Sequence, residues 1–293
     1  MRLLVTGGAG FIGSNFVRKQ LNNYERITVL DKFTYSGVRS NLTELEQQEK
    51  ITVLPGDICD KELLYKLVAN FDAIINFAAE SHVDRSIISS TEFVRTNTLG
   101  VQVLLDAILN VKPSIRFLQV STDEVYGTIQ TGSWDEQDPL EPNSPYAASK
   151  ASGELIARSY CKTHGLDVLI SRCSNNYGNY QFPEKLIPLA ITNIIEGKKI
   201  PLYGKGENVR DWLHVDDHCY ALEKILKNGK SGSVYNIGGG VELSNLELIE
   251  KILMFMEKTK KEINFVEDRK GHDFRYSVNW SKINHELHYK PTI

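Results

Sequence analysis

The sequence lacks several features that would point to particular classes of protein. Its four cysteines form no CxxC pair and no Cys/His ligand spacing, which argues against a disulfide scaffold or a zinc site and favours a reducing compartment. Its 34 basic and 37 acidic residues leave a net charge of -3, so no nucleic-acid or membrane surface is expected. The apolar run at residues 1–6 is too short for a signal peptide or a membrane span. We therefore expect a cytoplasmic protein.

What the chain does contain is an alternation of apolar, strand-like runs with helical patterns. At 293 residues with 41% hydrophobic content, it can bury a substantial core. Up to residue 173 the alternation is typical of βαβ units, and beyond residue 178 the elements become shorter. The patterns predict an α/β fold, a Rossmann-type doubly wound parallel sheet with a smaller α/β C-terminal lobe. We assign residues 1–172 and 212–238 to the sheet domain, and residues 173–211 and 239–293 to the interleaved smaller lobe.

A glycine-rich loop follows the first predicted strand, residues 2–6. Gly7 permits a tight turn, Gly10 lets a pyrophosphate approach the backbone, and Gly13 allows a helix to pack closely on the strand. Asp31 ends the second predicted strand, near the offset expected of a ribose-binding carboxylate. Together these features predict a dinucleotide site. A carboxylate at Asp31 would repel a 2′-phosphate, so NAD is favoured over NADP.

Small and polar residues follow the ends of two later predicted strands. After the third strand, Asp57 could accept hydrogen bonds from an adenine amino group or cap the helix predicted over residues 61–69, and both roles could coexist. After the strand predicted over residues 72–77, Ala78 and Ala79 leave room for a bound cofactor. Both positions therefore belong to the predicted nucleotide-binding edge of the sheet.

Three further polar segments allow more than one interpretation. Glu80, His82 and Asp84 have a spacing that suits neither a strand pair nor one helix face, so we expect no metal there. The basic glycine loop at residues 204–210 suits a substrate diphosphate, and solvated surface charge is the alternative. The segment at residues 268–276, dense in Arg, His and Asp, also fits anion or nucleotide binding.

Two pairs of residues carry the predicted chemistry. Tyr146 and Lys150 are four residues apart on a predicted helix, so they lie on one face and can address one ligand. The pKa of a tyrosine beside a lysine cation and an oxidised nicotinamide can fall towards neutrality, which would make it a base. Asp123 and Glu124 follow the strand predicted over residues 115–120, where a turn can present both carboxyls to one substrate. A helix-capping turn is the alternative.

The segments Thr6–Gly13 and Tyr146-xxx-Lys150 resemble the extended short-chain dehydrogenase/reductase superfamily, in its sugar-nucleotide branch. Within that branch, six segments resemble the dTDP-glucose 4,6-dehydratases: residues 31–35, 78–86, 121–127, 175–178, 210–213 and 268–272. The resemblance covers nearly the entire chain. It implies NAD as cofactor, a nucleotide sugar as substrate, and a homodimer formed through the helices at residues 91–111 and 145–164.

The same resemblance implies a reaction, the dehydration of dTDP-glucose to dTDP-4-keto-6-deoxyglucose. Tyr146 would remove the proton of the 4-hydroxyl, assisted by Thr122, while hydride passes from C4 to NAD. Glu124 would then take the C5 proton, protonated Asp123 would donate to the departing 6-hydroxyl, and hydride would return to C6. A UDP- or CDP-glucose 4,6-dehydratase, a UDP-sugar 4-epimerase and a non-catalytic NAD-sensing regulator are the alternatives.

Residues at two binding sites follow from the resemblance. Besides the three glycines, the implied NAD site comprises Phe11, Ile12, Asp31, Lys32, Thr34, Asp57, Ile58, Ala78, Ala79, Ser81, Thr96, Tyr146, Lys150 and Asn176. The implied substrate site comprises Ser81, Thr122, Asn175, Lys185, Leu186, Arg210, Asn245, Asp268, Arg269 and His272. The family usually continues with a further helix beyond residue 291, so we expect either a truncated sequence or a smaller lobe without its closing element.

Overall fold

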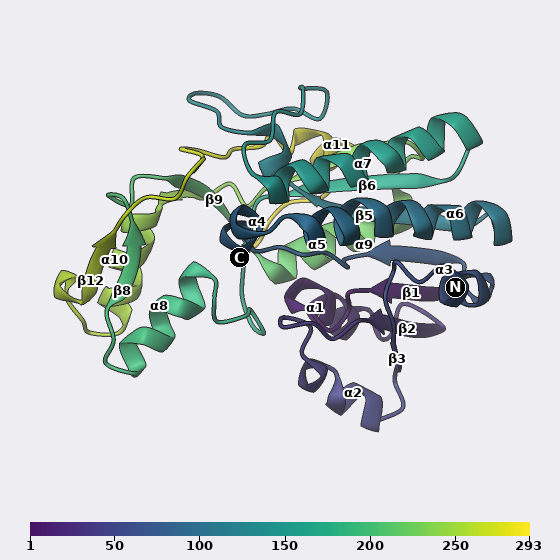
Figure 1. Ribbon diagram of the computed structural model, residues 1–293, viewed down its shortest axis with the longest axis horizontal. Helices are drawn as coiled ribbons and strands as arrows, with labels where there is room; N and C mark the ends of the chain where they lie inside the picture. The colour runs from purple at the N-terminus through teal and green to yellow at the C-terminus, as the bar shows by residue number, and fades with distance from the viewer.

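A seven-stranded parallel sheet forms the larger lobe of the computed structural model, which describes residues 1–293 (Figure 1). Its strands are β1 (Arg2–Thr6), β2 (Arg26–Asp31), β3 (Thr52–Pro55), β4 (Ala73–Asn76), β5 (Arg116–Thr122), β6 (Val168–Cys173) and β10 (Val234–Ile237). Their order across the sheet is β10-β6-β5-β4-β1-β2-β3. The direction of winding reverses between β1 and β4, and ligands of such sheets bind at the carboxyl edge beside that switch point. The predicted doubly wound α/β fold is confirmed.

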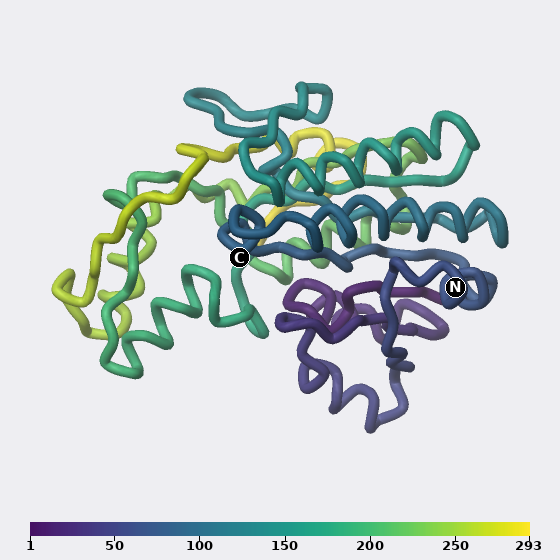
Figure 2. The backbone as a smooth tube through the Cα atoms, viewed as in Figure 1, coloured from purple at the N-terminus to yellow at the C-terminus, as the bar shows by residue number.

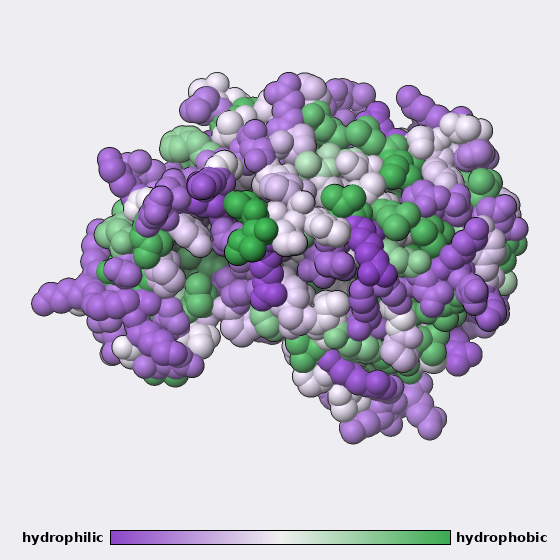
Figure 3. Space-filling view, viewed as in Figure 1, coloured by the Kyte–Doolittle hydropathy of each residue, from purple (hydrophilic) through white to green (hydrophobic).

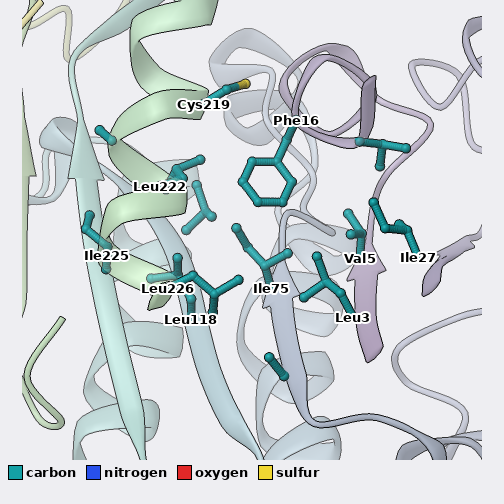
Figure 4. Packing of buried hydrophobic residues seen from close by; sticks show 14 of the residues in the cluster. Leu3, Val5, Phe16, Ile27, Ile75, Leu118, Cys219, Leu222, Ile225 and Leu226 are labelled. Atoms are coloured by element: carbon teal, nitrogen blue, oxygen red, sulfur yellow. The ribbon is translucent and has the colours of Figure 1, made fainter. Parts of the chain in front are cut away.

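Helices cover both faces of this sheet, because its strands are apolar on both sides. Side chains alternate along β1, so Leu3 and Val5 face one side and Leu4 faces the other. The first side is covered by α1 (Phe11–Gln20), α9 (Val215–Asn228) and α11 (Ser281–Leu287), and the second by α3 (Lys61–Leu67), α6 (Val101–Val111) and α7 (Pro145–His164). Figure 4 shows the first of these cores, where Phe16, Leu222 and Ile225 close over the strands.

The smaller lobe, drawn in green and yellow at the left of Figures 1 and 2, is built from short elements of the second half of the chain. Its elements are β7 (Asn175–Tyr177), α8 (Leu186–Ile195), β8 (Ile200–Tyr203), β9 (Val209–His214), β11 (Glu242–Ser244), α10 (Asn245–Phe255) and β12 (Ile263–Val266). One sheet has the order β11-β9-β7 and the other pairs β12 with β8. The lobe's apolar core comes mainly from α8, β8 and α10.

The predicted helix over residues 91–111 is interrupted. It begins as α5 (Thr91–Val94), widens to a π-helix over Arg95–Gly100 and continues as α6. Within the wide turn, the buried Asn97 amide donates to Glu80 O and to Ser149 Oγ, both at 2.9 Å. A Cβ on Gly153 of α7 would lie 2.2 Å from Asn97 O, so α7 crosses this turn at very close range. Polar contacts and close packing at one crossing therefore account for the local widening.

The last segment of the chain packs on the sheet domain. Ile283, Leu287 and Tyr289 belong to the same apolar core as β1 and α9. The backbone N–H groups of Thr292 and Ile293 both donate to the Asp217 carboxylate at 2.9 Å. Residues 283–293 therefore pack on the sheet domain, although from the sequence we assign them to the smaller lobe with the rest of residues 239–293. The other domain boundaries stay a prediction.

Two short helices, α2 (Thr43–Gln47) and α4 (Val83–Ile88), complete the larger lobe. None of the helices has both the length and the apolar character needed to cross a membrane. Polar side chains cover most of the face in Figure 3, and apolar ones gather in smaller patches.

Candidate active site

A cavity of about 330 Å³ lies at the carboxyl edge of the large sheet, bounded by both lobes. Residues at or just after the ends of six strands of the large sheet line it: Gly7, Asp31, Gly56, Phe77, Thr122 and Cys173. The smaller lobe closes the opposite side with the segment at residues 181–186 and with a residue of β9. The cavity thus lies at the switch point, where a doubly wound sheet binds its ligands.

The cavity brings together most of the predicted site residues. Every residue of the predicted NAD site lines it: Gly7, Gly10, Phe11, Ile12, Gly13, Asp31, Lys32, Thr34, Asp57, Ile58, Ala78, Ala79, Ser81, Thr96, Tyr146, Lys150 and Asn176. Of the predicted substrate residues, Ser81, Thr122, Asn175, Lys185 and Leu186 line it, whereas Arg210, Asn245, Asp268, Arg269 and His272 do not. These positions fit the predicted roles, which stay predictions.

The glycine loop leaves room for an anion because its backbone turns tightly and lies close to α1. Gly7 has a φ of +70°, which favours glycine, and a Cβ on it would lie 2.4 Å from Ala78 N. A Cβ on Gly13 would lie 2.5 Å from Gly7 O. A Cβ on Gly10 would meet only Gly7 O, at 3.4 Å, so this side of the loop is open. The first turn of α1, which lines the cavity, offers its N–H groups there.

Carboxylates surround the expected adenosine end of the cavity. The Asp31 carboxylate accepts from Ala9 N and Phe33 N at 2.9 and 2.8 Å, which fixes its position at the end of β2. Burial raises the pKa of Asp31, and these two hydrogen bonds oppose the rise. Asp57 forms an ion pair with Lys32 Nζ at 2.9 Å. The capping alternative for Asp57 does not hold, since Asp60 caps α3 by accepting from Leu63 N.

A single turn presents the two predicted acid–base carboxyls. Thr122 ends β5 and caps the 3-10 helix Asp123–Tyr126, accepting from Glu124 N at 3.3 Å and donating to Asp123 Oδ1 at 3.2 Å. Asp123 is only 2% exposed, and its Oδ2 has no hydrogen-bond partner in the protein. Both carboxyls line the cavity, so this one turn both caps the 3-10 helix and presents the predicted acid–base pair.

The environments of the two carboxyls differ in a way that suits an acid and a base. Burial raises the pKa of Asp123 well above its ordinary value, and the charges of Glu124 and Asp211 add to the rise. Burial also raises the pKa of Glu124, but the cations Arg210, Lys185 and Arg269 oppose it. Asp123 is therefore the better candidate for an acid, and Glu124 is the better candidate for a base.

Tyr146 and Lys150 lie on one buried face of α7, whose first turn is capped by Ser144 and begins with Pro145. Lys150 Nζ donates to Val120 O at 2.7 Å, and burial lowers the pKa of Lys150 to about 8. The pKa of Tyr146 is raised well above its ordinary value by burial and then by Glu124. The protein's own groups therefore do not produce the expected lowering, because burial and the charge of Glu124 outweigh the hydrogen bond with Thr122, which lowers the pKa.

The remaining predicted substrate residues form contacts beside the cavity. Arg210 donates to Asp273 O at 3.0 Å and stacks on the Tyr276 ring. Arg269 forms an ion pair with Asp84, at 2.5 Å, across the two lobes. Both guanidinium groups lie close enough to Glu124 to oppose the rise of its pKa. They therefore border the turn that carries Asp123 and Glu124 without lining the cavity.

Two other predicted substrate residues form a pair on the same loop, where His272 Nδ1 lies 2.7 Å from Asp268 Oδ1. Asn245 is the first residue of α10. In the segment considered for a metal, His82 lies 3.9 Å from Asp84 and 3.6 Å from Glu184. No group of three or more His, Cys, Asp or Glu side chains is arranged to hold a metal ion.

Sequence reasoning missed part of the cavity wall. The unassigned lining residues include Ser36, Gly37, Phe77, Glu80, Cys173, Ser174, Gln181, Phe182, Glu184 and Trp212. The rule that ligands bind at strand ends could have found Cys173 and Ser174, which end and follow β6. Trp212 and Phe182 come from the smaller lobe, and no local pattern places them opposite the sheet. The buried Trp212 Nε1 has no protein partner.

A Rossmann-type sheet, a glycine loop and a buried Tyr-xxx-Lys pair at one cavity define an extended short-chain dehydrogenase/reductase. The smaller lobe that closes this cavity places the chain in the nucleotide-sugar branch. More particularly, the chain belongs to the dTDP-glucose 4,6-dehydratases, within the wider family described as GDP-mannose 4,6 dehydratase, whose model matches residues 4–293.

Similar proteins support this assignment over the full length of the chain. A dTDP-glucose 4,6-dehydratase of Streptomyces niveus is 53% identical over 299 residues, which cover 100% of this chain and 89% of that protein. The crystal structure of DesIV, the dTDP-glucose 4,6-dehydratase of Streptomyces venezuelae, contains NAD and dTDP. It superimposes with a TM-score of 0.98 at 51% identity, covering 100% of this chain and 92% of that one. The dTDP-glucose 4,6-dehydratase of Bacillus anthracis in complex with NAD gives a TM-score of 0.93 at 48% identity, with the same coverage.

Proposed function

We propose that this protein converts dTDP-glucose to dTDP-4-keto-6-deoxyglucose with NAD as its cofactor. The single observation that carries the proposal is the convergence of Tyr146 with Asp123 and Glu124 on one cavity. Full-length similarity to dTDP-glucose 4,6-dehydratases, some of them solved with NAD bound, supports both the substrate and the cofactor. A nucleotide-sugar epimerase has no need of an acid at C6, and an NAD sensor has no need of either pair of catalytic residues.

The cavity suits NAD in several respects. The open side of Gly10 and the first turn of α1 accommodate a pyrophosphate, and the fixed carboxylate of Asp31 suits a ribose with a free 2′-hydroxyl. Ala78 and Ala79 leave space along the wall between. When bound, NAD would accept the hydride from C4 of the sugar and return it to C6.

The protein's own groups handle the protons at C4. Tyr146 takes the proton of the 4-hydroxyl, and Thr122, which also lowers the pKa of Tyr146 by hydrogen bonding, contacts the same oxygen. Lys150 is held on Val120 O beside the phenol and contributes positive charge at neutral pH, because it titrates near 8. Tyr146 would also lie near the positive charge of the oxidised cofactor when NAD is bound, and that charge would oppose the rise in its pKa caused by burial.

The carboxyl pair then removes water from C5 and C6. Oxidation at C4 makes the C5 proton acidic, and Glu124 accepts it. Asp123, which burial keeps protonated, donates its proton to the departing 6-hydroxyl, so that water leaves. The orphaned Oδ2 of Asp123 is the carboxyl atom available for this transfer.

We also propose that the protein acts in the cytoplasm as a homodimer. Val94, Leu99 and Leu155 are 52%, 47% and 51% exposed, and they come from the helices over residues 91–111 and from α7. Apolar residues gather over these helices in Figure 3. A second copy packed on this face would cover them. Sedimentation at several protein concentrations tests the assembly, and a monomer throughout would refute it.

Incubation with dTDP-glucose, UDP-glucose and CDP-glucose in parallel tests the substrate. A 4-keto-6-deoxy product, seen by its alkali-induced absorbance, should form from dTDP-glucose. Product from UDP- or CDP-glucose alone would move the assignment to another nucleotide, and no product from any would refute dehydration. D123N should abolish water loss if the enzyme is a dehydratase and change little if it is a 4-epimerase. Y146F should remove turnover of every sugar nucleotide, whereas an NAD sensor would be unaffected.

A further inference from the structure

One buried histidine lies directly behind the predicted NAD site and has no part in the reaction described above. His218, in the first half of α9, is 0% exposed, and its Nδ1 lies 2.9 Å from Oδ1 of Asn176. Asn176 is in β7 and lines the cavity. The contact therefore joins a helix of the sheet domain to a strand at the cavity wall.

The hydrogen bonds around Asn176 determine which way its amide faces. Asn176 Nδ2 donates to Ser174 O at 2.9 Å, and a carbonyl oxygen can only accept, so the nitrogen must be on that side. Oδ1 is then the atom that faces His218, and it needs a donor. A ring nitrogen supplies that donor only if Nδ1 carries hydrogen.

His218 is suited to hold the Asn176 amide in this one orientation. Burial lowers the pKa of His218 to about 3, so the ring is neutral at working pH and has one N–H. That hydrogen belongs to Nδ1, which leaves Nε2 as a buried acceptor without a partner. If the His218 ring flipped, it would lose its hydrogen bond to Asn176 Oδ1. If the Asn176 amide flipped, its NH2 group would face the N–H of His218, and its oxygen would face the carbonyl oxygen of Ser174.

We propose that His218 is a positioning residue that fixes the Asn176 amide so that its second N–H is presented to the bound NAD. No hydrogen bond to a protein oxygen uses that second N–H, and the Cys173 thiol is a neighbour of the Asn176 side chain at the cavity wall. The ligand atom that accepts it would be an oxygen of the cofactor, because Asn176 lines the same cavity as the glycine loop, Tyr146 and Lys150. The inference rests on the proposed use of NAD.

Two amide substitutions separate this role from general support of the core. H218N places an amide nitrogen near the position of Nδ1, and H218Q places it near that of Nε2. Because the donor to Asn176 is kept only in the first variant, H218Q should release NAD about tenfold faster than the wild type, as expected for one lost hydrogen bond at a buried site. H218N should release NAD within about twofold of the wild-type rate. The rate is measured on the holoenzyme by exchange of bound NAD against an excess of isotopically labelled NAD.

A double-mutant cycle with N176A tests whether the effect passes through the asparagine. If it does, H218Q should have no further effect on NAD release in the N176A background. The inference is overturned if H218Q releases NAD at the wild-type rate, if H218N is as fast as H218Q, or if the effect of H218Q persists in N176A. Should H218Q fail to fold, H218L, which removes both ring nitrogens, takes its place with the same expectations. A wild-type protein that binds no NAD would instead refute the proposed function.

Discussion

Replacing Lys150 with methionine should stabilise the folded protein while removing its activity. Lys150 is only 6% exposed, and burial lowers its pKa from an ordinary 10.5 to about 8. Each pKa unit corresponds to about 1.36 kcal/mol, so keeping this lysine charged at pH 7 costs about 3 kcal/mol. Methionine has a similar length and no charge. It would lose the hydrogen bond to Val120 O, worth about 1 kcal/mol, but that carbonyl also accepts from Gln119 Nε2.

The expected net gain in the free energy of unfolding of K150M is therefore about 2 kcal/mol at pH 7. Because the folded-state pKa is depressed, Lys150 in the wild type contributes no penalty above pH 10.5. As the pH falls from 10.5 to about 8, stability is lost, and it stays low below that. The difference in stability between K150M and the wild type should thus grow from pH 10.5 down to 8 and then become constant.

Urea unfolding of both proteins at several pH values, followed by circular dichroism, measures this difference. K150R is a matched control, since it keeps a cation at the same site and should show no gain. If K150M is less stable than the wild type at pH 7, or if the difference does not depend on pH, the lysine is not held charged against its desolvation and the argument fails.

Three further perturbations test the site and its supports. E124Q should lower product formation by about 10² to 10⁴ while C4 oxidation continues, so reduced nicotinamide should build up in its absorbance band, and normal turnover would contradict the assignment of the base. E154Q should lower the free energy of unfolding by about 3 kcal/mol, because Glu154 and its partner Arg172 are both fully buried. E196Q, at an exposed ion pair, should change the free energy of unfolding by less than about 0.5 kcal/mol. G13A should lower the melting temperature, since its Cβ would meet Gly7 O at 2.5 Å, and G10A should weaken NAD binding without that loss; equal melting temperatures would contradict the packing argument.

Local sequence patterns predicted the elements and residues whose placement depends on the strands of the large sheet. The order of strand, glycine loop and helix around Gly7, and the strand end before Thr122, needed only alternation and turn chemistry. The strands of the smaller lobe were harder to predict, because β7, β11 and β12 have three or four residues each and too little periodicity. Their pairing depends on partners dozens of residues away.

Two local features depend on neighbours that are distant in the sequence. Asp60 and not Asp57 caps α3, because Asp57 is held by Lys32 and Cys59 N at the cavity. The direction of the Tyr146 pKa shift in the protein alone could not be predicted from its spacing to Lys150, because it depends on burial and on Glu124, which the 3-10 helix after β5 supplies. Titration in a buried site is set by three-dimensional neighbours.

The catalytic turn keeps its position through a buried network behind it. Tyr126 ends the 3-10 helix, accepts a hydrogen bond from Arg172 Nη1 at 2.5 Å and donates to Asn236 Oδ1 at 2.9 Å. Arg172, in β6, also pairs with Glu154 of α7, the helix that carries Tyr146. One guanidinium therefore connects the turn with the carboxyl pair to the helix with the phenol. A buried ion pair contributes little net stability against its desolvation, but it has few alternative geometries, so we expect it to fix the distance between the carboxyl turn and the helix that carries Tyr146.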